Sequence, residues 1–252
     1  MRPTLTTICR ALGGDASLCN AVVEEVEDAG IDCLLDQGGI ELWGAGIHVI
    51  GKGWAGIVLA ARRGGQLAAL KILNPSGRRR SLLAEGIAAY AASLLGAAKP
   101  VLHVGRYSLV YEMADGPTLG EYRPGSPREA LDVVLRLTAK TYLLDRAGLR
   151  HNELARPEGH VVIDYAYSRP EPYIIDYESA TWRSRGATNL SQLLGGLPRT
   201  SLGRYCGLED VSRDSRLRQL LHRYKHAASD EERRAALAEV AGLLAARCTD
   251  RP

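Results

Sequence analysis

The sequence contains no phenylalanine and no long apolar run. A membrane-spanning helix needs about 20 consecutive apolar residues, so we expect no membrane partner. The N-terminus also lacks the apolar core of a secretory signal. Apolar residues make up 46% of the chain and charged residues 24%, as in an ordinary globular protein. The expected compartment is the cytoplasm.

Closely spaced metal-binding cysteines are missing too. The five cysteines are Cys9, Cys19, Cys33, Cys206 and Cys248, and no CxxC motif occurs. Because zinc sites use ligands paired closely in sequence, we expect no zinc site. An odd number of widely spaced cysteines is typical of buried thiols in a reducing compartment.

Lysine is scarce, and charge is distributed unevenly. Arginine outnumbers lysine 27 to 5. Residues 1–61 hold three basic and eight acidic side chains, whereas residues 62–252 carry a net charge of +8. A basic surface attracts polyanions such as RNA, although genome base composition alone could produce the same arginine excess.

The first 45 residues are predicted to form a small N-terminal module. Helical patterns cover residues 5–12 and 15–29, with Asp15 as the N-cap of the second helix. The runs IDCLL and IELW flank DQGG, which predicts a β-hairpin. Two helices followed by a hairpin indicate a winged-helix-like module. Its second helix is acidic, which argues against insertion into a nucleic-acid groove and favours a docking or structural role.

Strand patterns then give way to helical patterns. Residues 47–73 are apolar and β-rich, and Gly64-Gly65 predicts a hairpin turn within them. The later expected elements are a helix at about 80–95, strands at 101–104 and 108–113, helices at 127–147, 190–196, 213–227 and 230–247, and the short apolar runs HVVID and YIID. Strands first and helices later predict an α+β fold with two lobes.

A glycine-rich loop opens the strand-rich part. Residues 51–58 read GKGWAGIV and fit the pattern G-x-G-x-x-G-x-V. A Rossmann fold is not predicted, because a strand rather than a helix follows these glycines. Glycines in a hairpin let backbone N–H groups approach phosphate oxygens. The candidate nucleotide-binding residues of this loop are Gly51, Lys52, Gly53, Gly56 and Val58.

A lysine and a glutamate each stand alone in an apolar element. Lys71 is the only charge in LAALKIL, and Glu85 is the only charge in SLLAEGIAAYAASLL. A buried ammonium group needs a partner, so we expect Glu85 to hold Lys71 toward nucleotide phosphates. The alternatives are a lysine that reaches solvent and a surface acid at a helix start. The backbone of Glu112 and Met113, at a strand end, is a candidate for binding an adenine edge.

Two acids flank the short apolar runs of the helical part. Glu153 lies in HNEL before HVVID, and Asp176 lies 23 residues later in YIID. Phosphoryl transfer to a hydroxyl can use one acid to accept the proton and another to hold Mg²⁺. The structural alternative is a pair of loop acids that cap helices or turns.

These motifs resemble those of the protein-kinase superfamily, and specifically its atypical RIO-like branch. GKGWAGIV resembles the Gly-rich loop, ALKI resembles V-A-I-K, HNEL stands where H-R-D-L is usual, and IDYES stands where D-F-G is usual. HNELARPEGHVVID followed by YIIDYESA is similar to an archaeal group of predicted Ser/Thr kinases. That group is similar to archaeal RNA kinases that phosphorylate a ribose 2′-hydroxyl in tRNA.

The resemblance implies a role for each candidate residue. Lys71 would bind the phosphates of ATP, with Glu85 as its partner. Glu153 would be the catalytic base, and Asp176 would bind Mg²⁺. The second metal ligand of the family, usually Asn, falls on Glu158, and the alternatives are His160 or neither residue. ATP and Mg²⁺ are therefore the implied cofactors.

The resemblance also implies a bilobal kinase-like fold and a kinase activity. Residues 46–113 would form the N-lobe and residues 114–252 the C-lobe. The γ-phosphate of ATP would move to a hydroxyl, first of all a tRNA ribose 2′-hydroxyl. The alternatives are a serine/threonine protein kinase acting on a protein partner and a nucleotide-binding pseudokinase. Only about ten residues separate Ala180 from the next helix, whose expected N-cap is Asn189, and no A-P-E follows, which argues against an ordinary switched protein kinase.

Overall fold

The computed structural model describes residues 4–182, 186–211 and 213–249. The chain forms two compact units. The first comprises Met1–Tyr90 and Lys99–Met113, and the second comprises Ala91–Ala98 and Ala114–Pro252. An antiparallel sheet and helices occur together, which confirms the predicted α+β class. Within the described ranges, no helix is both long and apolar enough to cross a membrane.

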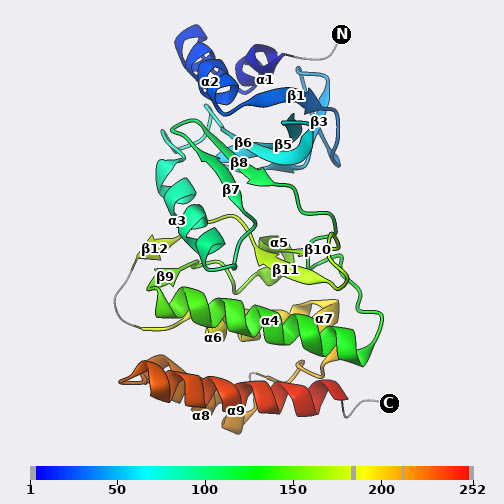
Figure 1. The fold of residues 1–252 in the computed structure, drawn as a ribbon, viewed down its shortest axis with the longest axis vertical. Coiled ribbons are helices and arrows are strands. Elements are labelled where there is room, and N and C mark those ends of the chain that lie inside the picture. The colour runs from blue at the N-terminus through cyan, green and yellow to red at the C-terminus, as the bar shows by residue number, and fades with distance from the viewer. Residues whose placement is uncertain (1–3, 183–185, 212, 250–252) are drawn as a thin grey trace. The chain divides into compact units, whose positions relative to one another are not determined.

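An antiparallel sheet dominates the first unit (Figure 1). The elements of this unit are α1 (Leu5–Ala11), α2 (Ala16–Asp28), β1 (Ile31–Leu35), β2 (Ile40–Leu42), β3 (Ile47–Val49), β4 (Gly51–Lys52), β5 (Gly56–Arg63), β6 (Gln66–Leu73), β7 (Val101–Val104) and β8 (Ser108–Glu112), and the start of α3 (Leu83–Leu94). The strand order is β1-β5-β6-β8-β7, and β4 also pairs with β5. The strands predicted at 101–104 and 108–113 and the helix at about 80–95 are confirmed as β7, β8 and α3.

The predicted turn at Gly64-Gly65 is confirmed. Both residues have positive φ, 55° and 77°, a conformation that glycine adopts without a Cβ penalty. A two-residue loop of this kind matches the twist of antiparallel strands. The turn thereby fixes the register of β5 and β6, which places Lys71 opposite Val58.

The predicted hairpin across DQGG is wrong. β1 pairs with β5, with Leu34 opposite Ala61, and β2 pairs with β3, with Leu42 opposite Ile47. The edge of β5 carries backbone groups that need partners, and β1 satisfies them as an added strand. Local turn signals could not reveal this competing partner, which lies further along the chain. The winged-helix-like prediction therefore keeps its two helices and loses its hairpin.

Both predicted N-terminal helices are confirmed as α1 and α2. Asp15 is the N-cap of α2, since its Oδ1 accepts a hydrogen bond of 2.8 Å from Leu18 N–H. The helices pack into the same apolar core as the sheet. This core includes Ile8, Val22, Val26, Ile57, Leu59, Leu70 and Ile72.

One acid of α2 anchors the turn between β7 and β8. The Glu25 carboxylate accepts hydrogen bonds from the backbone N–H groups of Arg106, Tyr107 and Ser108, at 2.9, 2.8 and 2.6 Å. A carboxylate that accepts several N–H bonds holds a turn firmly in place. This contact gives the acidic helix a structural role within the first unit.

Helices and two short strand pairs make up the second unit, and α4, α8 and α9 lie on one side of β10 and β11 (Figure 1). The elements of this unit are α4 (Pro127–Arg146), β9 (Leu149–Arg150), α5 (Pro157–His160), β10 (Val161–Asp164), β11 (Glu171–Ile174), β12 (Thr181–Trp182), α6 (Asn189–Gly196), a 3₁₀ turn (Leu197–Arg199), α7 (Ser201–Tyr205), α8 (Ser215–His226) and α9 (Asp230–Thr249). The four predicted helices are confirmed as α4, α6, α8 and α9. A strand of two residues, such as β9, or a single helical turn, such as α5, carries too little periodicity to be predicted.

Asp145, near the end of α4, accepts hydrogen bonds from residues of two other helices. It accepts hydrogen bonds from Asn189 N–H and Asn189 Nδ2, both at 3.0 Å, and from the Tyr224 hydroxyl at 2.9 Å. Burial raises the pKa of Asp145, and these donors hold its charged form. Asn189 was expected to be the N-cap of α6, which is wrong: Thr188 occupies that position. Asp145 itself satisfies the start of α6, because it also accepts hydrogen bonds from Thr188 N–H at 3.0 Å and Leu190 N–H at 3.3 Å.

Four of the five cysteines are paired, which overturns the expectation of free thiols. Cys9 and Cys19 form one disulfide, and Cys206 and Cys248 form another. Cys33 is a half-buried thiol. The paired residues are 10 and 42 positions apart in sequence. Their spacing carried no signal because only the folded helices bring the partners together.

Candidate active site

The glycine-rich loop forms a tight antiparallel hairpin. β4 consists of Gly51 and Lys52, and Gly51 pairs with Val58 of β5. Gly53 N–H donates a hydrogen bond of 2.9 Å to the Gly56 carbonyl. All five nucleotide-binding candidates of the loop therefore lie in one hairpin of the first unit.

Two glycines of this hairpin have different surroundings. A Cβ at Gly56 would lie 2.5 Å from the Ile72 carbonyl oxygen and 3.1 Å from Lys71 Cγ, closer than real Cβ atoms come to backbone. A Cβ at Gly53 would meet no atom nearer than the Gly56 carbonyl oxygen, at 3.6 Å. Gly56 is thus required for the packing of Lys71, whereas the fold of the first unit leaves room for a side chain at Gly53.

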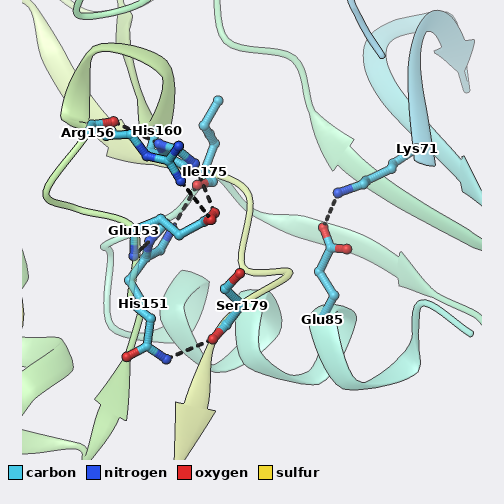
Figure 2. Close-up of polar contacts among 9 residues, drawn as sticks. Lys71, Glu85, His151, Glu153, Arg156, His160, Ile175 and Ser179 are labelled. Carbon is cyan, nitrogen blue, oxygen red and sulfur yellow. Dashed lines mark hydrogen bonds and ion pairs between the residues drawn. The ribbon is translucent and has the colours of Figure 1, made fainter. Parts of the chain in front are cut away.

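Lys71 and Glu85 form a buried ion pair (Figure 2). Lys71 extends from β6, and Glu85 lies in the first turn of α3. Lys71 Nζ lies 2.6 Å from Glu85 Oε1, and the two residues are only 7% and 5% exposed. A buried charge is strongly destabilising without a partner, so each side chain stabilises the charged form of the other.

Glu112 and Met113 lie at and just beyond the end of β8. Glu112 N–H donates to the Pro100 carbonyl at 2.9 Å, and its carboxylate is 3.2 Å from Lys99 Nζ. Met113 N–H reaches the Leu67 carbonyl at 3.5 Å. Their role toward an adenine ring stays a prediction.

Three potential metal ligands gather in the second unit. Glu153, His160 and Asp176 each offer one atom, and these atoms all lie within 4.8 Å of one another. The strand pair β10–β11 explains this: Val161, which follows His160, is paired with Ile174. The end of α5 is therefore held beside the residues that follow β11, which places His160 near Asp176. Glu153 joins them through its contact of 3.0 Å with His160.

Glu153 contacts two cationic or polar neighbours (Figure 2). Its Oε2 lies 3.0 Å from His160 Nε2, and its Oε1 accepts a hydrogen bond of 3.2 Å from Arg156 Nη2. The side chain is 24% exposed, so a bound molecule could reach it. The arrangement fixes both carboxylate oxygens in orientation.

Two residues of this site have left-handed backbone. Asn152 and Asp176 have φ values of 71° and 64°, which costs non-glycine residues about 1–3 kcal/mol. Asn152 Nδ2 donates hydrogen bonds to the Ser179 carbonyl at 2.7 Å and to Thr181 Oγ1 at 3.0 Å. These bonds tie the segment before Glu153 to the segment after Asp176.

His151 is the buried support of the site. Its Nε2 lies 2.9 Å from the Ile175 carbonyl, which can only accept, so Nε2 carries the proton. Burial lowers the pKa of His151 to about 4, so the ring is neutral near pH 7. It packs edge-on against Tyr177 and His160, with ring centroids 4.9 and 5.5 Å away. The histidine of HNEL could have been noted from the sequence, but its burial could not.

The three donor atoms fit the expected Mg²⁺ only in part. Two carboxylates suit Mg²⁺, but the third donor is an imidazole nitrogen, and Mg²⁺ prefers oxygen ligands. Glu158, the second ligand expected from the sequence, is not in the group of three: its Oε1 lies 3.8 Å from Arg199 Nε. His160, the other choice, is in that group.

Solved structures resemble this chain in fold, whereas sequence comparisons find no match. No protein-family model matches this chain, and no curated protein matches it in sequence. Among solved structures, the crystal structure of a kinase domain is similar, with a TM-score of 0.43 and 16% sequence identity. The match covers 66% of this chain and 62% of that chain, less than two thirds of the kinase domain's length.

Proposed function

We propose that this chain is an ATP-dependent phosphotransferase of the protein-kinase-like superfamily, which moves the γ-phosphate of ATP to a hydroxyl acceptor. The observation that carries the proposal is the meeting of Glu153, His160 and Asp176 within 4.8 Å. In this proposal residues 46–113 act as the N-lobe and residues 114–252 as the C-lobe. Residues 1–45 support the N-lobe.

The strand-rich unit is proposed to bind the nucleotide. The backbone N–H groups of the hairpin from Gly51 to Val58 would approach the phosphates, and the spare room at Gly53 supports this. Lys71 would neutralise phosphate charge while Glu85 holds its ammonium group in place. The backbone of Glu112 and Met113 would bind the adenine edge.

The chemistry is assigned to the acids of the second unit. The acceptor oxygen attacks the γ-phosphorus, its proton passes to the Glu153 carboxylate, and the bond to the β,γ-bridging oxygen breaks to release ADP. Arg156 and His160 hold Glu153 in orientation. Asp176 is proposed to hold the metal, with Glu158 as the second ligand predicted from the sequence. A bound divalent cation supplies charge neutralisation on the phosphates.

We propose a tRNA ribose 2′-hydroxyl as the acceptor. The net charge of +8 over residues 62–252 supports a polyanionic partner. Helix α8 contains no acid and exposes Arg216, Arg218 and Lys225. Such a helix suits contact with a phosphate backbone, which attracts it at long range. A serine or threonine of a protein is the competing acceptor.

The test is a labelling assay with two acceptors. The full chain is incubated with γ-labelled ATP, a divalent metal, and either bulk tRNA or a mixture of protein substrates. We expect label in tRNA, at a level that falls at least 100-fold in Glu153→Gln and Asp176→Asn, because each removes a charge needed for transfer. Asn tolerates the left-handed backbone at 176, so this variant should keep its fold.

The outcomes separate the alternatives. Label found only in protein would replace the RNA acceptor by a protein acceptor. ATP binding without label in either acceptor would identify a nucleotide-binding pseudokinase. Unchanged labelling in the Asp176→Asn variant would mean that this acid is not the metal ligand. His48→Asn, an exposed histidine in β3, serves as the control that should label like the unmodified chain.

A further inference from the structure

The donor atoms around Glu153 are chemically mixed. Glu153, His160 and Asp176 are all half-buried, and each contributes one ligand atom to a group no wider than 4.8 Å. Two donors are carboxylate oxygens, and the third is an imidazole nitrogen. A protein that only had to hold Mg²⁺ would use oxygen donors throughout, because Mg²⁺ keeps waters and carboxylates as ligands.

The orientation of His160 is fixed by its other ring nitrogen. His160 Nδ1 lies 2.7 Å from the backbone carbonyl of Arg156, a group that can only accept a hydrogen bond. Nδ1 therefore carries a proton, and in the neutral ring Nε2 has a free lone pair. A hydrogen bond from the second nitrogen to a backbone carbonyl is the usual arrangement for a histidine that binds a metal.

This lone pair points toward a negatively charged group. His160 Nε2 lies 3.0 Å from Glu153 Oε2, so with the proton on Nδ1 the lone pair of Nε2 faces a carboxylate oxygen. A cation at this place could bind the imidazole nitrogen and the carboxylate oxygen together. Asp176, the third member of the group, offers a second carboxylate oxygen within 4.8 Å of both.

We infer that Glu153, His160 and Asp176 bind a first-row divalent transition cation, such as Mn²⁺, in preference to Mg²⁺. The inference rests on the proposed function in that it names the metal of the same site. Imidazole nitrogen suits first-row transition ions, and carboxylates suit Mn²⁺ and Mg²⁺ alike. His160 is therefore the residue that sets the choice of metal, and in this inference it takes the place predicted for Glu158. Asp176 and Glu153 Oε2 supply the charge that holds either ion. Glu153 Oε1, which accepts a hydrogen bond from Arg156, stays the proton acceptor of the proposed reaction.

The test measures metal binding without nucleotide or acceptor. Mn²⁺ is titrated into the full chain, and free Mn²⁺ is followed by electron paramagnetic resonance. We expect one Mn²⁺ per chain, displaced by Mg²⁺ only at a concentration at least tenfold higher. His160→Gln replaces the nitrogen by an oxygen donor. It should lower Mn²⁺ affinity about tenfold and change Mg²⁺ affinity less than threefold.

Two further variants set the limits of this experiment. Asp176→Asn should weaken both metals, because it removes charge without changing the type of the remaining donors. His48→Asn, on the exposed β3 strand, is the matched control and should change neither affinity. Circular dichroism on each variant checks that the chain is folded.

Three results would overturn the inference. They are no Mn²⁺ binding, equal binding of Mn²⁺ and Mg²⁺, and an equal loss of both metals in His160→Gln, which would mark a merely structural histidine. These results are independent of the labelling assay. Phosphate transfer with no preference for Mn²⁺ would sink this inference alone, whereas Mn²⁺ binding without transfer would sink the proposed function alone.

Discussion

Gly53 and Gly56 lie in the same hairpin but face different neighbours. At Gly56 an added Cβ would lie 2.5 Å from the Ile72 carbonyl oxygen, and at Gly53 it would meet nothing nearer than 3.6 Å. We expect Gly56→Ala to lower the unfolding free energy by about 1–3 kcal/mol, because the strand must shift to admit the methyl group. Gly53→Ala should leave stability within about 0.5 kcal/mol.

The same pair of variants separates the folding role of the loop from its proposed nucleotide role. Urea unfolding gives the stability, and equilibrium binding of ATP gives the affinity. We expect Gly53→Ala to weaken ATP binding about tenfold at unchanged stability, since its methyl group would obstruct approaching phosphates. Equal ATP affinity in Gly53→Ala and the unmodified chain would remove Gly53 from the nucleotide site.

The buried Lys71–Glu85 pair gives a second prediction. Lys71→Met alone leaves the Glu85 carboxylate without its 2.6 Å partner and should cost about 3–5 kcal/mol of stability. The double variant Lys71→Met, Glu85→Leu removes both charges and should recover most of that loss. Labelling activity should stay lost in both variants, because the ammonium group is assigned to the phosphates.

Three chains settle that prediction: the unmodified chain, the single variant and the double variant. Each is unfolded in urea and assayed with labelled ATP. Recovery of stability without recovery of activity would support a role for Lys71 beyond packing. A double variant that is both stable and active would show that the pair serves the fold alone.

Single residues were predicted from the sequence where one charge stood out against an apolar pattern. Lys71 and Glu85 could be paired this way because each is the only charge in its element. His160 could not be placed beside Asp176, since their meeting depends on the register of β10 against β11. Periodicity reports which residues are buried, but not which strand pairs with which.

Whole elements were predicted best where their own residues decide the structure. The Gly64-Gly65 turn was predicted because two residues with positive φ impose it locally. The hairpin across DQGG was wrong because β5 offers β1 a better partner from outside the segment. The disulfides were missed for the same reason, since their partners meet only when helices pack.

The Cys206–Cys248 disulfide gives a prediction for the helices it joins. It ties the end of α7 to the end of α9, where Arg247 donates to the Gly207 carbonyl at 3.0 Å and contacts Asp214. Closing a loop of 42 residues restricts the unfolded chain more than closing one of 10. Replacing both cysteines by serine should therefore cost about 3–4 kcal/mol.

The Cys9–Cys19 pair is the matched control for this prediction. Its replacement by two serines should cost less, about 2–3 kcal/mol, because its loop is shorter. Urea unfolding under non-reducing conditions gives both values, and mass spectrometry verifies that the pairs are oxidised. The reverse order of losses would contradict the prediction, and thiols found free by mass spectrometry would contradict the disulfides themselves.

At the scale of the whole molecule, the distribution of charge bears on the acceptor. The first 61 residues are acidic and the rest of the chain is basic. Binding to RNA releases counterions, so the affinity for RNA falls steeply as the salt concentration rises. Each phosphate contact makes the slope of log affinity against log salt concentration steeper by roughly 0.7–0.9. Binding to a neutral protein segment has no comparable slope. The salt dependence of acceptor binding therefore distinguishes the two proposed acceptor classes without any assumption about the reaction.

Single charge reversals show which part of the molecule causes the salt dependence of acceptor binding. Arg218→Glu and Lys225→Glu change exposed cations of α8, and Arg10→Glu changes an exposed cation of the acidic N-terminal part. If α8 contacts phosphates, each α8 reversal should weaken tRNA binding and lower the salt slope by about 1, and Arg10→Glu should leave the slope unchanged. Filter binding of labelled tRNA over a range of salt concentrations measures both quantities. Equal effects of all three reversals would attribute the binding to net charge alone and would remove α8 as an RNA contact. A salt slope near zero in the unmodified chain would favour a protein acceptor.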